Sequence, residues 1–174
     1  GQSGEHLVSE GLFQGKTAFV SGLHWLSAPL QEVPLTALRA NILCRHHNSL
    51  LSPVDTGGIS ALDLFREVER LQSLRARLKP KRVYDIVSYR LDGCLFERWC
   101  MKTVVNFIVA LEKSLLWWTG ASHSSPPVSL VRSIFGQEPV APPLGLYFAL
   151  HPDRPLPEGE GVGVKPVVAN RTRL

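Results

Sequence analysis

The chain has 174 residues, of which 44% are hydrophobic and 20% are charged. This composition is typical of an ordinary globular protein and excludes a collagen or a wholly disordered chain. The length is sufficient for one domain or two small ones. The net charge of +4 permits a polyanionic partner without requiring one.

The number of cysteines indicates whether the protein works in a reducing or an oxidising compartment. Cys44, Cys94 and Cys100 are too few for a disulfide framework, and an odd number leaves one thiol unpaired in a secreted protein. We therefore expect a reducing, cytoplasmic location, and the polar first ten residues contain no signal peptide. Because the first residue is glycine and the only methionine is Met101, we expect a fragment or a processed chain.

A membrane span is not expected. The most apolar stretch, Thr103 to Trp118, carries Glu112 and Lys113. It is also shorter than the roughly 20 apolar residues that cross a bilayer. We interpret it as part of a buried helix.

The first of three expected regions, residues 1–56, is irregular and rich in turn-forming residues. It contains prolines at positions 29, 34 and 53 and a short candidate strand from Thr17 to Val20. Long helices are not expected here. A small metal-supported motif would suit this region.

The second region, residues 57–120, has helical periodicity. Apolar residues recur every three or four positions from Gly58 to Leu78, which predicts an amphipathic helix capped by Thr56 or Ser60 and ended by Pro80. A long core helix is predicted from Cys94 to Trp118.

Polar residues on that second helix recur at three- to five-residue spacing: Glu97, Arg98, Lys102 and Asn106. They either face the N-terminal region or a ligand, or form an exposed face with an ion pair. Cys94 and Cys100, six residues apart, are awkwardly spaced for one shared metal and are expected to be core thiols.

The third region, residues 121–174, is rich in proline and glycine. We expect a short helix from Val128 to Phe135 and short strands at Leu144 to Leu150 and Val162 to Val168. The fold class is therefore α+β, with a small N-terminal motif, a mainly helical region and a short C-terminal β segment.

Metal-competent side chains gather between Leu43 and Asp55. The Cys-x-x-His spacing of Cys44 and His47 lets one turn offer two ligands to Zn²⁺, whereas a structural zinc site needs four. The alternative is a buried thiol near a solvent-facing histidine. The sequence leaves both readings open.

Two segments resemble the HNH endonuclease family, whose fold is a ββα-metal motif. They are Gly4-Glu5-His6-Leu7-Val8-Ser9 and Leu43-Cys44-Arg45-His46-His47-Asn48-Ser49. In that family the first motif ends a strand and the second opens a helix. A truncated or degenerate member would lack the upstream Cys-x-x-Cys pair that is absent here.

The resemblance implies a role for each matched residue. His6 would be the general base that deprotonates the attacking water, and Glu5 and Asn48 would bind a catalytic Mg²⁺ or Mn²⁺. Cys44 and His47 would form one half of a structural zinc site. The segment from Asn48 to Asp55 is also similar to an HN-x-x-LSP-x-D segment of uncharacterised bacterial proteins. This similarity does not imply a function.

A run of five positive charges ends the first predicted helix: Arg75, Arg77, Lys79, Lys81 and Arg82. These side chains would either contact phosphates or simply be solvated at a helix C-terminus, where cations are favoured.

The leading hypothesis is metal-dependent hydrolysis of phosphodiesters in DNA or RNA. The first alternative is an inactive, zinc-stabilised module that binds nucleic acid or protein. The second is a structural helical domain without metal. The sequence does not indicate an oligomeric state.

Overall fold

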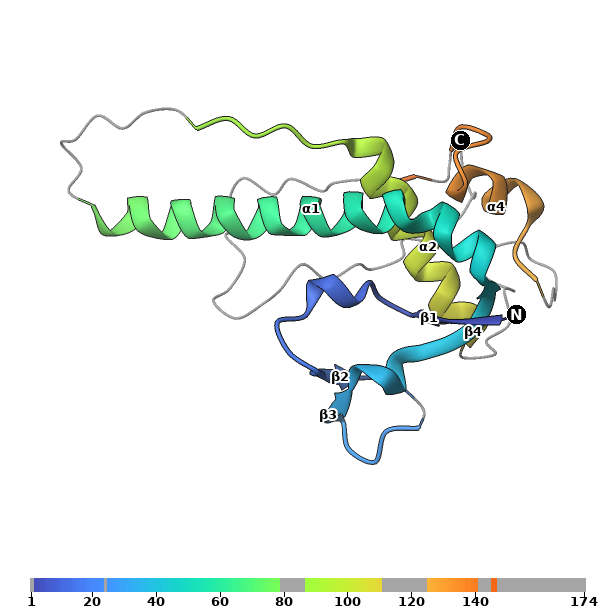
Figure 1. Cartoon of the computed structure of the whole chain (residues 1–174). Helices are drawn as coiled ribbons and strands as arrows, with labels where there is room; N and C mark the ends of the chain where they lie inside the picture. The colour runs from blue at the N-terminus through green and yellow to red at the C-terminus, as the bar shows by residue number, and fades with distance from the viewer. Residues whose placement is uncertain (1, 24, 79–86, 111–124, 141–144, 147–174) are drawn as a thin grey trace, which may run out of the picture.

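The computed structural model describes residues 2–23, 25–78, 87–110, 125–140 and 145–146. It has one long helix, α1, crossed by a second helix, α2, with short strands on one side of them (Figure 1). The α+β class expected from the sequence is confirmed.

The strands form two small antiparallel pairs. One pair joins β1 (Gln2–His6) to β4 (Arg39–Cys44), and the other joins β2 (Thr17–Ser21) to β3 (Leu30–Pro34). Two short 3-10 turns, η1 (Glu10–Leu12) and η2 (Leu35–Leu38), lie in the connections. The strand expected from Thr17 is confirmed as β2, whereas the distant pairing of β1 with β4 was not predicted.

Helix α1 (Arg45–Arg77) follows β4 directly and has 33 residues, so it is about 50 Å long. The prediction of a helix starting near Gly58 was wrong about the start. Thr56 and Ser60 lie inside the helix and do not cap it, and the N-cap position is Cys44.

The reason for the early start is burial. Leu51 and Val54 are almost completely buried, at 2% and 0% exposure, and they flank Pro53 on the same helix. Pro53 lacks the N–H that would bond to the carbonyl of Ser49, a cost that normally interrupts a helix. The apolar contacts on both sides of the proline offset that cost.

Helix α2 (Gly93–Ala110) packs tightly across α1. A Cβ atom built on Gly58 would lie 2.2 Å from Cγ of Trp99, so the absence of a side chain there permits the close approach. The rings of Phe65 and Phe96 meet edge to face with centroids 5.6 Å apart. The expected central core helix is thus confirmed over this range, and its predicted residues 111–118 lie outside the described residues.

Helix α4 (Val128–Ile134) confirms the short helix expected there, and it buries Leu130 and Ile134 against the main core. That core joins residues of α1, α2 and α4, with Leu12 of η1. A smaller hydrophobic cluster lies at the β2–β3 pair and contains Ala18, Val33, Leu35 and Leu38.

Several expectations concern undescribed parts or remain untested. The C-terminal strands lie outside the described residues, apart from residues 145–146, which are not in a strand. The boundary expected at residue 56 falls inside α1, so the three-part division stays a prediction. Among the described residues, no helix is long and apolar enough to cross a membrane.

Candidate functional site

A buried ion cluster connects the N-terminal strand to both long helices. Lys102 of α2 places its Nζ atom 2.5 Å from Oε1 of Glu5 on β1 and 2.7 Å from each carboxylate oxygen of Asp55 on α1. The Lys102 and Glu5 side chains are 4% and 5% exposed, while that of Asp55 is 24% exposed. Asp55 therefore links the buried charges to the surface.

Three neutral side chains support these charges. The Ser9 hydroxyl donates to Oδ1 of Asp55 at 2.5 Å, and the indole Nε1 of Trp99 donates to the Ser9 oxygen at 2.9 Å. Asn106, one turn beyond Lys102, donates to the backbone carbonyl of His6 at 3.3 Å. We call Glu5, Ser9, Asp55, Trp99 and Lys102 the Lys102 cluster.

An open hollow of about 440 Å³ lies against α1 and shares Asp55 with the Lys102 cluster. Its other lining residues are Asn48, Ser49 and Ser52. This volume is within the range of ligand sites, but those are usually lined mainly by apolar side chains. The described lining residues all carry polar side chains, which suit a hydrophilic ligand that makes hydrogen bonds.

His6, the expected general base, is already engaged. Its Nε2 atom lies 2.6 Å from Nε of Arg39, which donates to it, and 3.1 Å from a carboxylate oxygen of Glu10. Burial, followed by the positive charge of Arg39, lowers the pKa of His6, and the nearby carboxylates of Glu10 and Glu5 oppose this only in part. The lowered pKa favours the neutral imidazole, whose Nε2 accepts the hydrogen bond from Arg39.

Strand register separates His6 from the start of α1. His6 lies opposite Arg39, whereas Cys44, the residue before α1, lies opposite Gln2. Four residues along a strand correspond to about 13 Å. Neighbouring strand residues also point to opposite faces, and Glu5 turns to Lys102 while His6 turns to Arg39. No measured contact joins His6 or Glu5 to Asn48 among the described residues.

Cys44 and His47 do come together. Sγ of Cys44 lies 3.4 Å from Nδ1 of His47, and a tetrahedral zinc ion would hold a sulfur and a nitrogen about 3.5 Å apart. The pair thus fits two of the four zinc positions. Both residues are exposed, which contradicts the alternative of a buried Cys44. Among the described residues, no group of three His, Cys, Asp or Glu side chains could hold a metal.

The proposed catalytic cation fits Glu5 poorly. The carboxylate oxygen that would bind Mg²⁺ or Mn²⁺ is in contact with the Lys102 ammonium, and both side chains are buried. A cation at this oxygen would have to displace a positive charge that is fixed in α2. The implied pairing of Glu5 with Asn48 on one metal therefore stays a prediction that this geometry does not favour.

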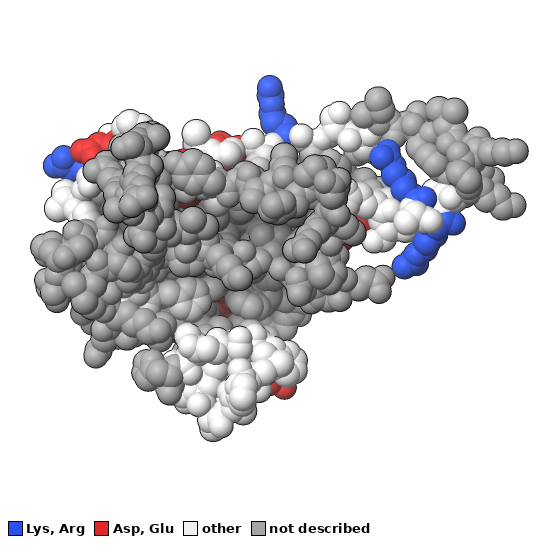
Figure 2. All heavy atoms as spheres, turned by 180° about the vertical axis from the view of Figure 1, so that it is seen from behind, with Lys and Arg blue, Asp and Glu red and all other residues white. Residues whose placement is uncertain are grey.

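Of the basic run, Arg75 and Arg77 lie exposed in the last turn of α1. Lys79, Lys81 and Arg82 lie outside the described residues. Figure 2 shows Lys and Arg side chains projecting at the end of the molecule where α1 terminates. Nearer the hollow, Arg45, His46 and His47 are exposed in the first turn of α1.

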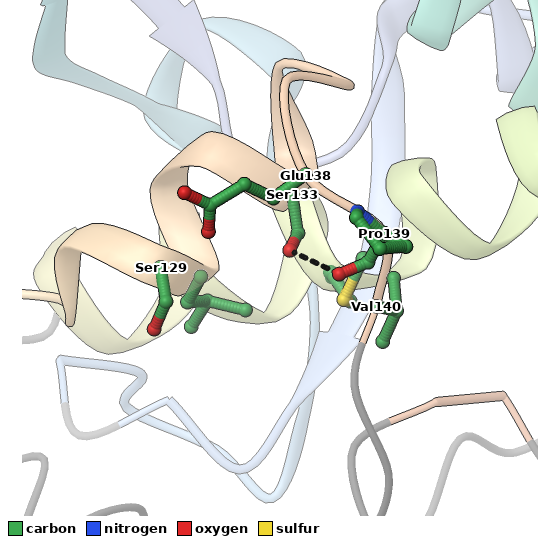
Figure 3. A pocket seen from close by; sticks show the side chains of 7 residues that line it. Ser129, Ser133, Glu138, Pro139 and Val140 are labelled. Carbon is green, nitrogen blue, oxygen red and sulfur yellow. Dashed lines mark hydrogen bonds between the residues drawn. The ribbon is translucent and has the colours of Figure 1, made fainter.

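A second cavity, of about 80 Å³, lies between α4 and the residues that follow it (Figure 3). Its lining includes Met101, Leu130 and Val140, and the Ser133 hydroxyl donates across it to the Pro139 carbonyl at 3.2 Å. It is far smaller than the ligand sites of most proteins. We interpret it as a packing space.

The polar stripe of α2 is not an exposed face. Lys102 and Asn106 contact the N-terminal region, Arg98 donates to the carbonyl of Ile134, and Glu97 accepts from the amide of Leu146. The expectation that these residues face the N-terminal region is thus confirmed for Lys102 and Asn106, whereas Glu97 and Arg98 contact residues after α2. The contribution of Asp55, Ser9 and Trp99 was missed, since nothing in their local sequence shows that they meet Lys102.

The remaining thiols differ in environment. Cys100 is buried as expected, and burial raises its pKa to about 11, with a smaller effect of Glu97. Cys94 is exposed at the start of α2, so its assignment to the core was wrong. The helix begins at Gly93, and in its first turn Leu95 and Phe96 pack on the main core while Cys94 faces solvent.

Comparisons of the chain with protein-family models, with curated proteins and with solved structures gave no match. Its function must therefore be argued from the geometry of these sites.

Proposed function

We propose that the protein is a nucleic-acid-binding module that holds the sugar-phosphate backbone at the hollow on α1. The observation that carries this proposal is the grouping of Asn48, Ser49, Ser52 and Asp55 around one open hollow, with the exposed Arg45 one helical turn before Ser49. Most hydrogen bonds between proteins and DNA go to phosphate and sugar oxygens, and such side chains make them.

The charges near the hollow favour an anionic ligand despite Asp55. Both oxygens of the Asp55 carboxylate face the Lys102 ammonium, which offsets part of the negative charge that Asp55 and Glu5 carry together. Arg45 stands in the first turn of α1, where the helix dipole also favours anions. Because the described residues that line the hollow include no aromatic side chain, the proposed contacts are to the backbone and not to stacked bases.

The order of the elements supports a link to the HNH resemblance. Two paired antiparallel strands, β1 and β4, precede α1, and β4 runs into it without a break. We propose that Cys44 and His47 provide two zinc ligands at this junction, as the family implies. Zinc would stiffen the first turn of α1 beside the hollow.

We favour binding over cleavage because the expected general base and the expected acidic metal ligand are both paired with other side chains. His6 accepts a hydrogen bond from Arg39, and Glu5 is paired with Lys102. Metal-dependent hydrolysis is the second candidate, since Asn48 and Asp55 bring an amide and a carboxylate to the same hollow. These are ligand types that suit Mg²⁺.

Binding is tested by fluorescence anisotropy with labelled 20-nucleotide single strands and duplexes of DNA and RNA at several salt concentrations. We expect the double variant Arg45→Ala, Asn48→Ala to weaken binding about tenfold and to reduce its salt dependence. Arg90→Ala removes another exposed arginine and is the matched control. Unchanged affinity in the double variant, or an equal loss in the control, contradicts the proposal.

Metal-dependent hydrolysis, the second candidate, is distinguished from binding alone by an assay for nicking of supercoiled plasmid with Mg²⁺ or Mn²⁺. Nicking that disappears in both His6→Ala and Asp55→Asn would establish hydrolysis and replace the binding-only proposal. Binding without nicking supports the module as proposed.

A further inference from the structure

The Lys102 ammonium is surrounded by carboxylate oxygens as a metal ion would be. Three oxygens from two residues lie 2.5, 2.7 and 2.7 Å from Nζ. An ammonium has three N–H donors, so each can be directed to one oxygen. The two distances of 2.7 Å to Asp55 are those of charge-assisted hydrogen bonds, so the resemblance to a metal site lies in the arrangement of the oxygens around one cation.

We infer that Lys102 is a built-in cation that takes the place of a divalent metal between Glu5 and Asp55. The carboxylates come from β1 and α1, and the ammonium comes from α2. The cation therefore joins three elements that are distant in sequence, which is the structural task of many bound metals. This inference does not depend on nucleic-acid binding.

The charge balance explains why the single positive charge of Lys102 can stand in place of the two charges of a divalent metal. Two carboxylates and one ammonium leave a formal charge of −1. The Ser9 hydroxyl donates to Asp55, and the Trp99 indole donates to Ser9, so hydrogen bonds stabilise the excess charge on Asp55. Asp55 is also the more exposed carboxylate, at 24% against 5% for Glu5, so water screens it as well.

Burial explains why a metal would not displace the lysine. The Lys102 side chain is only 4% exposed, and its withdrawal would leave Glu5 buried without a partner until a metal arrived. Uncompensated buried charges are strongly unfavourable. The fixed ammonium requires no dehydration of a free ion, and it is present at every metal concentration.

The test is thermal unfolding of the full chain without added metal and with MgCl₂ or MnCl₂. We expect neither Mg²⁺ nor Mn²⁺ to shift the Tm of the wild type. Lys102→Met keeps an unbranched side chain without charge, and it should lower Tm by about 10 °C when no metal is added. Mn²⁺ should recover at least half of that loss, because the two carboxylates are then free to bind it. Lys16→Met, at an exposed lysine, should behave as the wild type.

Two outcomes overturn the inference. One is a rise in the Tm of the wild type with Mg²⁺ or Mn²⁺ that Glu5→Gln abolishes, since the cluster would then take a metal with Lys102 present. The other is a folded Lys102→Met variant that Mn²⁺ does not stabilise. If this variant does not fold, Mn²⁺ binding by the wild type is compared with that of Glu5→Gln by electron paramagnetic resonance, because Glu5 belongs to the Lys102 cluster and is not among the residues that line the hollow. Equal stoichiometry supports the inference, and one additional ion in the wild type overturns it.

Discussion

At the level of single residues, His6 links the stability of the protein to pH. Burial and the neighbouring Arg39 lower its pKa from the ordinary value of 6.5. The unfolded chain therefore takes up a proton at His6 at a higher pH than the folded chain does. The contribution of this neutral histidine to stability is complete well above pH 6.5, and it is lost as the pH falls from that value towards the folded pKa.

We expect the free energy of unfolding to decrease between pH 7.5 and pH 5.5, and to decrease less in His6→Gln. Glutamine retains an acceptor for the Arg39 hydrogen bond but does not titrate. Urea denaturation followed by circular dichroism at both pH values measures the difference. If the variant loses as much stability as the wild type, His6 is not the source of the pH dependence.

At the level of elements, α1 divides into a supported half and a projecting half. All of its fully buried residues, Leu51, Val54, Gly58 and Ala61, lie before its midpoint or next to it. Beyond Phe65, the apolar side chains belong to neither hydrophobic cluster of the described residues, and Leu74 is 41% exposed. Packing therefore stabilises the two halves to different extents.

Hydrogen exchange should reveal this difference. We expect the amides of residues 68–77 to exchange faster than those of residues 54–61, because an isolated helical end opens without breaking the core. Leu74→Ala should change the free energy of unfolding by less than about 0.5 kcal/mol. Equally slow exchange along the whole helix would show that another part of the molecule covers its last third.

The elements also show where sequence patterns were sufficient. The helical periodicity after Gly58 predicted that part of α1 correctly, and α2, α4 and β2 were recognised from their apolar residues. The periodicity missed the first turns of α1 because Pro53 disfavours a helix locally, although the HNH resemblance implied that the segment from Leu43 to Ser49 opens a helix. Their stability comes from contacts of Leu51 and Val54 with distant residues, which a local pattern does not contain.

At the level of the whole molecule, the same limitation applies to the candidate site. The sequence identified Glu5, Asn48, Cys44 and His47 as polar residues of interest, and the close contact between Cys44 and His47 follows from their spacing on one turn. The meeting of Glu5, Asp55 and Lys102 depends on how β1, α1 and α2 pack. No local spacing encodes that arrangement, so the partner of Glu5 was not predicted.

The two hydrophobic clusters suggest that the molecule unfolds in two steps. The smaller cluster, at β2 and β3, contains Val33, and the main core contains Leu51. Phe13 packs against both clusters. Contacts through this side chain are few, so we do not expect them to make the two clusters unfold together. The β2–β3 pair should therefore open at lower free energy than α1 and α2 do.

Matched core truncations test this division by hydrogen exchange. Val33→Ala should cost about 2 kcal/mol and increase exchange only in residues 17–34, while Leu51→Ala should cost about 3 kcal/mol and increase exchange throughout the described residues. The second effect is global because Leu51 lies among side chains from α1, α2 and α4. Faster exchange of α1 and α2 in Val33→Ala would mean that the two clusters unfold together, and the contacts of Phe13 would then be strong enough to couple them.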